Sequence, residues 1–139
     1  MKTFDCTFRV SSKITRPLRS RNIEAAVWYV MDRVFGDCRF GCLKNRSATV
    51  EKIIEYVGDG EQVSYANATL ARTNDGRLAT YDVVVGVSGI AHVVVDAENK
   101  EDADVRGRDY IQATADVGNL RSFPEFSAQL ISADEVFAE

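Results

Sequence analysis

The order of the predicted secondary-structure elements narrows the possible folds most. Judged by the period of their apolar residues, these elements follow one another as strand, helix, several strands, helix and strand. Residues 3–10 alternate apolar with polar side chains, as a half-buried strand does. Residues 23–35 carry apolar side chains at helical spacing, between a good N-cap, Asn22, and Gly36. They predict the main core helix, with an inward stripe of Ile23, Val27, Val30, Met31 and Val34.

Four β-rich segments lie between the two helical ones, at residues 48–57, 62–73, 78–87 and 90–95. Gly, Asn, Asp and Ser residues predict tight turns between them at 58–60, 74–76 and 88–89. Acidic residues from Asp96 onward predict a second helix that runs to about Asp116. Its expected inward stripe is Ala103, Tyr110, Ile111 and Thr114. A last strand is expected at 120–131, interrupted at Pro124, before a frayed tail or helical turn at 134–139.

These patterns together predict the fold class. Helices that flank a run of antiparallel hairpins bury their apolar sides best on one face of the sheet. We therefore expect an α+β fold, a two-layer sandwich in which a mostly antiparallel sheet of about five to six strands carries two helices on one face. A chain of 139 residues has the size of one domain, so residues 1–139 are expected to form a single α+β domain.

The composition is that of an ordinary globular protein, with 45% hydrophobic and 27% charged residues, which argues against disorder. No apolar run approaches the ~20 residues that span a bilayer, and the first residues lack the apolar segment of a secretion signal. A cytoplasmic location is therefore expected. Cys6, Cys38 and Cys42 are an odd number of cysteines, which favours reduced thiols, while a disulfide or a metal at Cys38 and Cys42 stays open.

Few residues point to catalysis. His92 is the one histidine, and Asp96 lies about 13 Å further along the same face of an extended strand, too far for a direct pair. The Cys38-x-x-x-Cys42 spacing lacks the paired knuckles of a zinc site, and the glycines form no phosphate-binding loop. We expect no cofactor, no metal and no enzymatic activity. A small enzyme with a scattered site around His92 or Cys38 remains as an alternative.

The charge is divided unevenly along the chain. Residues 1–52 hold 11 Lys and Arg against 5 Asp and Glu, a net +6, whereas residues 53–139 hold 6 against 16, a net −10. Residues 13–21 are predicted to form a basic loop, and Arg16, Arg19 and Arg21 are its candidate contacts for nucleic acid or for an acidic protein. The acidic counterparts are Glu98, Glu101, Asp102 and Asp104. Both sets also fit an ordinary solvated surface.

Residues 93–111, with the sequence VVVDAENKEDADVRGRDYI, resemble the strand, acidic turn and helix of many small phage and mobile-element accessory proteins. Anti-CRISPR proteins are the best-known functional class among such acidic α+β chains, and the resemblance implies inhibition through surface contacts to a nuclease complex. The leading hypothesis is a non-enzymatic protein whose charged surfaces bind a host protein or nucleoprotein complex, as a phage-type inhibitor of host nucleic-acid machinery would. The alternative is an RNA- or DNA-binding accessory module that uses the basic loop at 13–21.

Overall fold

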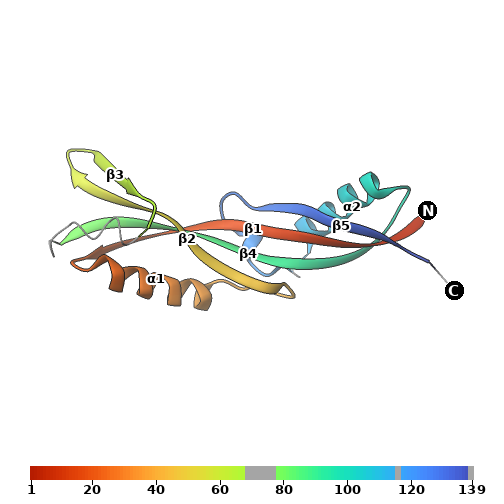
Figure 1. Cartoon of the computed structure of the whole chain (residues 1–139), viewed down its shortest axis with the longest axis horizontal. Coiled ribbons are helices and arrows are strands. Elements are labelled where there is room, and N and C mark those ends of the chain that lie inside the picture. The colour runs from red at the N-terminus through yellow and green to blue at the C-terminus, as the bar shows by residue number, and fades with distance from the viewer. Residues whose placement is uncertain (68–77, 115–116, 138–139) are drawn as a thin grey trace. The chain divides into compact units, whose positions relative to one another are not determined.

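The computed structural model describes residues 1–67, 78–114 and 117–137. In these residues it has the predicted α+β fold, a five-stranded antiparallel sheet with two helices packed against it (Figure 1). The strands are β1 (Lys2–Ser20), β2 (Lys44–Gly58), β3 (Glu61–Tyr65), β4 (Ala79–Ala97) and β5 (Ser127–Val136), in the order β3-β2-β4-β1-β5. The helices are α1 (Ile23–Asp37) and α2 (Lys100–Ala113), and a short 3-10 turn, η3, covers Leu120–Ser122.

The chain divides into two compact units. Unit 1 consists of Met1–Ser12, Cys38–Ser47 and Ser88–Glu139, and unit 2 consists of Lys13–Asp37 and Ala48–Val87. Three strands, β1, β2 and β4, contribute residues to both units. That residues 1–139 behave as one domain stays a prediction.

In unit 1, α2 packs against β5 and the first half of β1 (Figure 1). β1 pairs with β5 from Thr3↔Val136 to Ser11↔Ser127, with a bulge between Thr7 and Phe8. The buried stripe of α2 is Ala103, Gly107 and Ile111. A Cβ on Gly107 would lie 2.6 Å from the ring of Phe8, so the glycine is what lets the helix approach β1 this closely. The prediction that Tyr110 points into the core is wrong. Because Ala103, Gly107 and Ile111 form the buried side of α2, Tyr110 is exposed to solvent.

In unit 2, α1 covers a core of Ile23, Ala26, Ile53 and Tyr81. Asn22 caps this helix as predicted, since its Oδ1 accepts hydrogen bonds from the backbone N–H groups of Glu24 (3.1 Å) and Ala25 (3.2 Å). The helix continues past Gly36 to Asp37, slightly beyond the predicted end. The turn predicted at 58–60 is confirmed, and it joins β2 to β3 through residues with positive φ.

The predicted basic loop at residues 13–21 is wrong. These residues continue β1 without interruption to Ser20, because the inward positions Ser12 and Ile14 extend the alternation of the first half. β5 pairs only with residues as far as Ser11, so Pro17 lies where β1 needs no partner on that side. Proline is tolerated at such an edge position.

The turn predicted at Ser88 and Gly89 is also wrong, since both lie inside the continuous strand β4. A Cβ on Gly89 would lie 2.8 Å from the Cβ of Leu43. This glycine therefore allows a close approach of the segment before β2, and its backbone needs no turn conformation.

The C-terminal elements begin later than predicted. Residues 120–122 form η3 with Leu120 fully buried, and the strand β5 extends from Ser127 to Val136 instead of ending at residue 131. The expected frayed tail is wrong for residues 134–136, because they pair with residues 3–5 of β1. α2 ends at Ala113, short of the expected Asp116.

Several predictions fall outside the described residues, namely the hairpin turn at 74–76, the strand over 68–73 and Asp116. In the part that is described, neither α1 nor α2 nor any other helix combines the length and the apolar character needed to cross a membrane.

Candidate functional site

The three arginines predicted as basic contacts do not form one array. Strand alternation places Arg16 on the face of β1 that carries the buried Ile14, where Arg16 itself is half-buried. Arg19 is exposed on the opposite face, and Arg21 follows the end of the strand. Lys13 forms an ion pair with Glu51 at 3.1 Å, which offsets part of the local positive charge. A strand separates these cations where a loop was expected to gather them.

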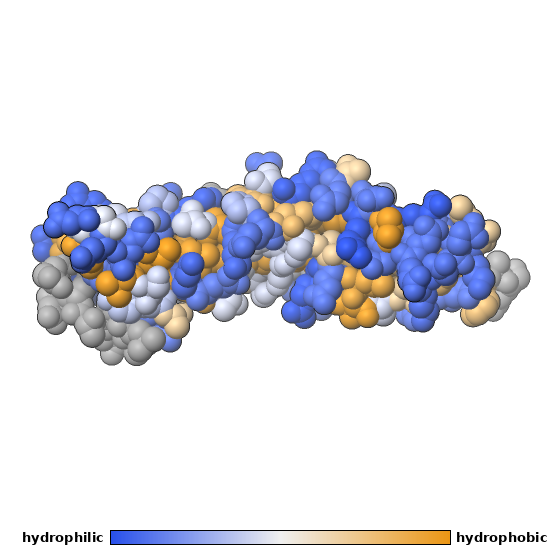
Figure 2. Space-filling view, turned by 90° about the horizontal axis from the view of Figure 1, so that it is seen from above, coloured by the Kyte–Doolittle hydropathy of each residue, from blue (hydrophilic) through white to orange (hydrophobic). Residues whose placement is uncertain are grey.

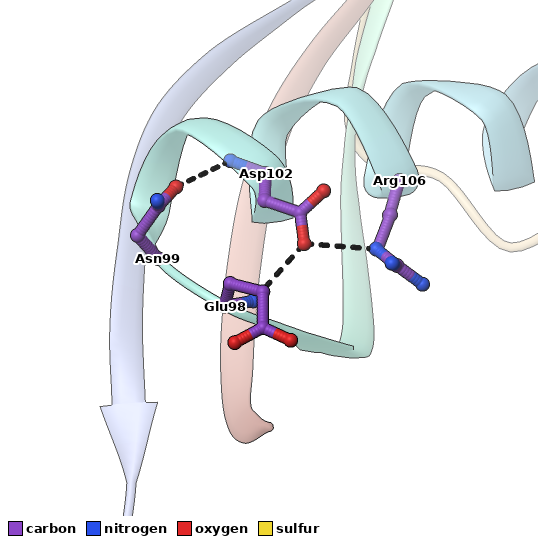
Figure 3. Close-up of polar contacts among 4 residues, drawn as sticks. All are labelled: Glu98, Asn99, Asp102 and Arg106. Atoms are coloured by element: carbon purple, nitrogen blue, oxygen red, sulfur yellow. Dashed lines mark hydrogen bonds and ion pairs between the residues drawn. The ribbon is translucent and has the colours of Figure 1, made fainter.

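The predicted acidic contacts lie at and just before the start of α2, where Asp102 and Asp104 are already engaged. Figure 3 shows the contacts of Asp102. Oδ2 of Asp102 accepts hydrogen bonds from the backbone N–H of Glu98 and from Nε of Arg106, both at 3.0 Å. The bond from Glu98 is the main cause of a lowered pKa at Asp102. The neighbouring Asp104 pairs with Arg108, whose Nε lies 2.8 Å away.

Asn99 completes this local structure. Its Oδ1 accepts a hydrogen bond from the backbone N–H of Asp102 at 2.8 Å, so each residue satisfies a backbone donor at the helix start (Figure 3). The acidic run therefore caps and stabilises α2. Of the predicted acidic set, Glu98 and Glu101 are exposed, whereas Asp102 and Asp104 are half-buried.

The charge division seen along the sequence is not reproduced by the two units. Unit 1 carries 9 Lys and Arg against 12 Asp and Glu, a net −3, and unit 2 carries 8 against 9, a net −1, which together give the −4 of the chain. Folding thus mixes the basic and acidic stretches. The charged residues provide a weaker basis for a docking surface than the sequence indicated.

A more distinctive surface lies on the outer side of α1. Figure 2 shows hydrophobic patches among hydrophilic residues on the face of the molecule seen from above. Independently of that view, α1 carries the most exposed large hydrophobic residue of the described chain, Trp28, at 80%. A groove of about 400 Å³ is lined by Val27, Trp28, Met31 and Asp32. Beside it, the guanidinium of Arg33 stacks 4.4 Å from the ring centre of Tyr29. We call the four groove residues, Val27, Trp28, Met31 and Asp32, the α1 outer face. Val27 and Met31, both predicted to face inward, are half-buried at its edge, and Val27 also packs against the core of unit 2.

Sequence reasoning missed this face, although a signal was present. Trp28 falls outside the predicted inward stripe of its helix, and a large aromatic residue on the solvent side of an amphipathic helix is unusual. Exposed aromatic side chains next to a groove are typical of protein-binding surfaces.

A second cavity, of about 220 Å³, lies in unit 1. His92 lines it together with Cys42, Lys44 and Tyr110. The Nδ1 atom of His92 lies 3.2 Å from Oγ1 of Thr7. In the described part of the chain no carboxylate hydrogen-bonds to this imidazole, so the orienting acid of a hydrolase triad is not among the described residues. Cys38, the other residue of the enzymatic alternative, is buried and is not part of the lining.

None of the three cysteines forms a disulfide. Cys6 and Cys38 are buried and Cys42 is exposed. Burial raises the pKa of the Cys6 thiol, with a further contribution from Asp5. Within residues 1–67, 78–114 and 117–137 no group of three or more His, Cys, Asp or Glu side chains is arranged to hold a metal ion.

Comparison with known proteins adds no relative from which a role could be carried over. The sequence matches no protein-family model, and neither a curated protein nor a solved structure matches it. The geometry of the chain's own residues is therefore what supports any function.

Proposed function

We propose that this chain is a non-enzymatic protein that binds another protein through the α1 outer face, with Trp28 as the anchor. The observation that carries the proposal is the exposure of Trp28, 80%, beside a groove whose described lining residues all belong to α1. Tryptophan is among the residues most enriched at the energetic centres of protein interfaces. Water contact with so much apolar surface is unfavourable, and a partner would remove it.

The size of the indole sets the expected affinity contribution. A tryptophan side chain buries roughly 200 Å², so at 80% exposure about 160 Å² is available to a partner. At ~25 cal/mol per Å² this corresponds to at most about 4 kcal/mol. Docking covers such a side chain incompletely, and alanine retains its Cβ, so we expect about half of this value.

The chemistry of the groove also describes the partner. Asp32 contributes a carboxylate to the lining, while the neighbouring Arg33 is stacked on Tyr29. The matching surface is an apolar pocket with a cation at its rim. A net charge of −4 favours the approach of the whole chain to a basic surface. Proteins that bind nucleic acid present such surfaces, so we propose a host nucleic-acid-binding protein as the partner.

The finer proposal, a phage-type inhibitor similar to anti-CRISPR proteins, rests on the resemblance of residues 93–111. In that role the chain would occupy a basic groove that otherwise holds DNA or RNA. The α1 outer face then replaces Arg16, Arg19 and Arg21 and the acidic set of residues 98–104 as the leading contact surface.

Photo-crosslinking in host lysate tests the proposal. A benzophenone amino acid placed at position 28 should capture a nucleic-acid-binding protein, and the same group at Val105, an exposed position on α2, should not. With that partner purified, Trp28→Ala should weaken binding about 30-fold, as ~2 kcal/mol predicts, whereas Val105→Ala should leave it unchanged. Equal capture at both positions, or equal affinity of both variants, would contradict the proposal.

Oligonucleotide binding by the same protein tests the nucleic-acid alternative. A labelled oligonucleotide that binds in a salt-sensitive manner, more weakly to Arg16→Ala and Arg19→Ala, would favour the accessory module instead. In that case the partner of the chain is nucleic acid, and the proposed protein contact is wrong.

A further inference from the structure

The strand β5 forms one edge of the described sheet, and β1 is its neighbour there (Figure 1). Every second residue of an antiparallel strand directs its backbone N–H and C=O groups away from the neighbour on one side. No described backbone group outside β1 hydrogen-bonds to residues 127–136. The helix α2 packs on a face of the strands, with Gly107 over Phe8, and leaves this edge open in the described chain. A ten-residue edge strand is a template for another strand.

The side chains of β5 form two sets that alternate between the faces of the sheet. One set, on the face that α2 covers, lies opposite buried residues of β1 and consists of Ala128, Leu130, Ala133 and Glu135. The other set lies opposite less buried residues of β1 and consists of Ser127, Gln129, Ser132, Asp134 and Val136. The alternation changes phase at Ile131, which is the extra residue of the bulge and is 54% exposed.

These two sets restrict how two copies of β5 can pair. Directly opposite residues of an antiparallel pair point to the same face, so each set must meet its own members. In a symmetric pair, each contact also occurs a second time with the two copies exchanged. The register that sets Leu130 opposite Ala133 meets both conditions over both halves of the strand. It also pairs Ser127 with Val136, Ala128 with Glu135 and Gln129 with Asp134.

The same register separates the charges and gathers apolar side chains. Asp134 and Glu135 each meet an uncharged residue, whereas a register centred on Asp134 would set two carboxylates opposite each other. The twofold axis falls between Ile131 and Ser132, so the exposed Ile131 side chains of both copies lie beside it. Their removal from water favours association.

We propose that β5 pairs antiparallel with β5 of a second copy of this chain, with Leu130 opposite Ala133 and Ile131 beside the twofold axis. The sheets of the two copies then continue into one another. The proposal does not rest on the α1 outer face, because β5 belongs to unit 1 and α1 to unit 2. A dimer would carry that face twice, which raises the avidity for a partner present in several copies along a nucleic acid.

Disulfide trapping tests the register. Cys42→Ser first removes the one exposed thiol. Gln129→Cys and Asp134→Cys are then made as separate proteins in this background, mixed and oxidised, and the linked peptides are quantified by mass spectrometry. The register sets position 129 of one copy opposite position 134 of the other, whereas two equal positions lie roughly 15 Å apart along the strands. A disulfide requires Cα atoms within about 7 Å, so we expect the 129–134 link to exceed either equal-position link by roughly tenfold.

Sedimentation equilibrium of the wild-type chain measures the dissociation constant of the dimer without any substitution. Ile131→Ser should weaken the dimer about 30-fold, or ~2 kcal/mol, since the exposed half of two isoleucines no longer leaves water on association. The matched control is Val94→Ser. Val94 is 65% exposed on β4, an inner strand of the sheet, in the same unit, so this change should leave the dissociation constant unchanged. Circular dichroism establishes that each variant is folded.

Three outcomes would overturn the proposal. The first is a wild-type chain that stays monomeric up to about 1 mM, where even an association of ~4 kcal/mol would be seen. The second is an equal-position disulfide as abundant as the 129–134 link. The third is equal dimerisation of Ile131→Ser and Val94→Ser. After the first outcome, the occupant of the β5 edge would have to be a strand of another protein, and the second copy would be the wrong partner.

Discussion

Gly118 is the position at which a single added methyl group should destabilise the fold most. Its φ is +63°, a left-handed conformation that favours glycine. A Cβ there would lie 1.7 Å from the carbonyl oxygen of Arg39 and 2.8 Å from the backbone nitrogen of Gly41. These are backbone atoms, so no side-chain rotation can relieve the contact. Gly118→Ala must therefore displace the segment around residue 39 from residues 117–120.

The cost follows from what this displacement breaks. The backbone N–H of Asn119 donates to the carbonyl of Arg39 at 2.9 Å, and the N–H of Arg39 donates to Oδ1 of Asn119 at 2.7 Å. Losing two such bonds costs about 2 kcal/mol, and the left-handed conformation of alanine costs about 1.5 kcal/mol. Alanine returns ~0.5 kcal/mol by restricting the unfolded chain. We expect a net loss of about 3 kcal/mol in the free energy of unfolding.

Gly36→Ala is the matched control. Gly36 lies in α1, has no atom within 4 Å of an added Cβ, and has no positive φ. The same chemical change should therefore be neutral or stabilise the protein by up to ~1 kcal/mol. Urea unfolding followed by circular dichroism measures both free energies. Hydrogen exchange at the amides of Arg39 and Asn119 should accelerate in Gly118→Ala and stay unchanged in Gly36→Ala.

A double-mutant cycle tests the stated cause. If Gly118→Ala acts by separating the two segments, Asn119→Ala should cost about 1 kcal/mol in wild type and much less in the Gly118→Ala background. The reasoning is refuted if Gly118→Ala unfolds at the same urea concentration as wild type, or if the two substitutions are simply additive.

Two other predictions concern stability. Asp102→Asn should lower the melting temperature at neutral pH, because the N–H of Glu98 and the Arg106 side chain stabilise the carboxylate and lower its pKa. The stabilisation by the ionised Asp102 is complete above the carboxylate's pKa in the unfolded chain and disappears as pH falls through the lower pKa of the folded state. The melting temperatures of wild type and Asp102→Asn should therefore converge in acid. A constant difference between them at all pH values would argue against this cause. Ser12→Ala should leave the free energy of unfolding unchanged or raise it, because the buried Oγ lacks a hydrogen-bond partner in the described residues. A loss above ~1 kcal/mol in urea unfolding would reveal a partner for this hydroxyl.

The parts of the fold that the sequence predicted correctly depend on neighbouring residues. The alternation of residues 3–10 and the helical spacing after Asn22 are local patterns, and the α+β class follows from their order. The two main errors arose where tertiary packing decides the backbone conformation. Gly89 resembles a turn until Leu43 packs against it, and the charged residues after Ser11 resemble a loop until the inward positions Ser12 and Ile14 are buried.

By itself the sequence determined the α+β class and the core helix with its Asn22 cap, because these depend on residues close together in the chain, and the total charge, which depends on composition alone. Only the tertiary structure decided which side chains share a surface. Strand alternation placed Arg16 and Arg19 on opposite faces, and the packing of α1 left Trp28 in solvent. Folding also brought Lys44, His92 and Val117 around one cavity. Contacts between residues so far apart in the chain depend on how the strands and helices pack, which no local pattern records.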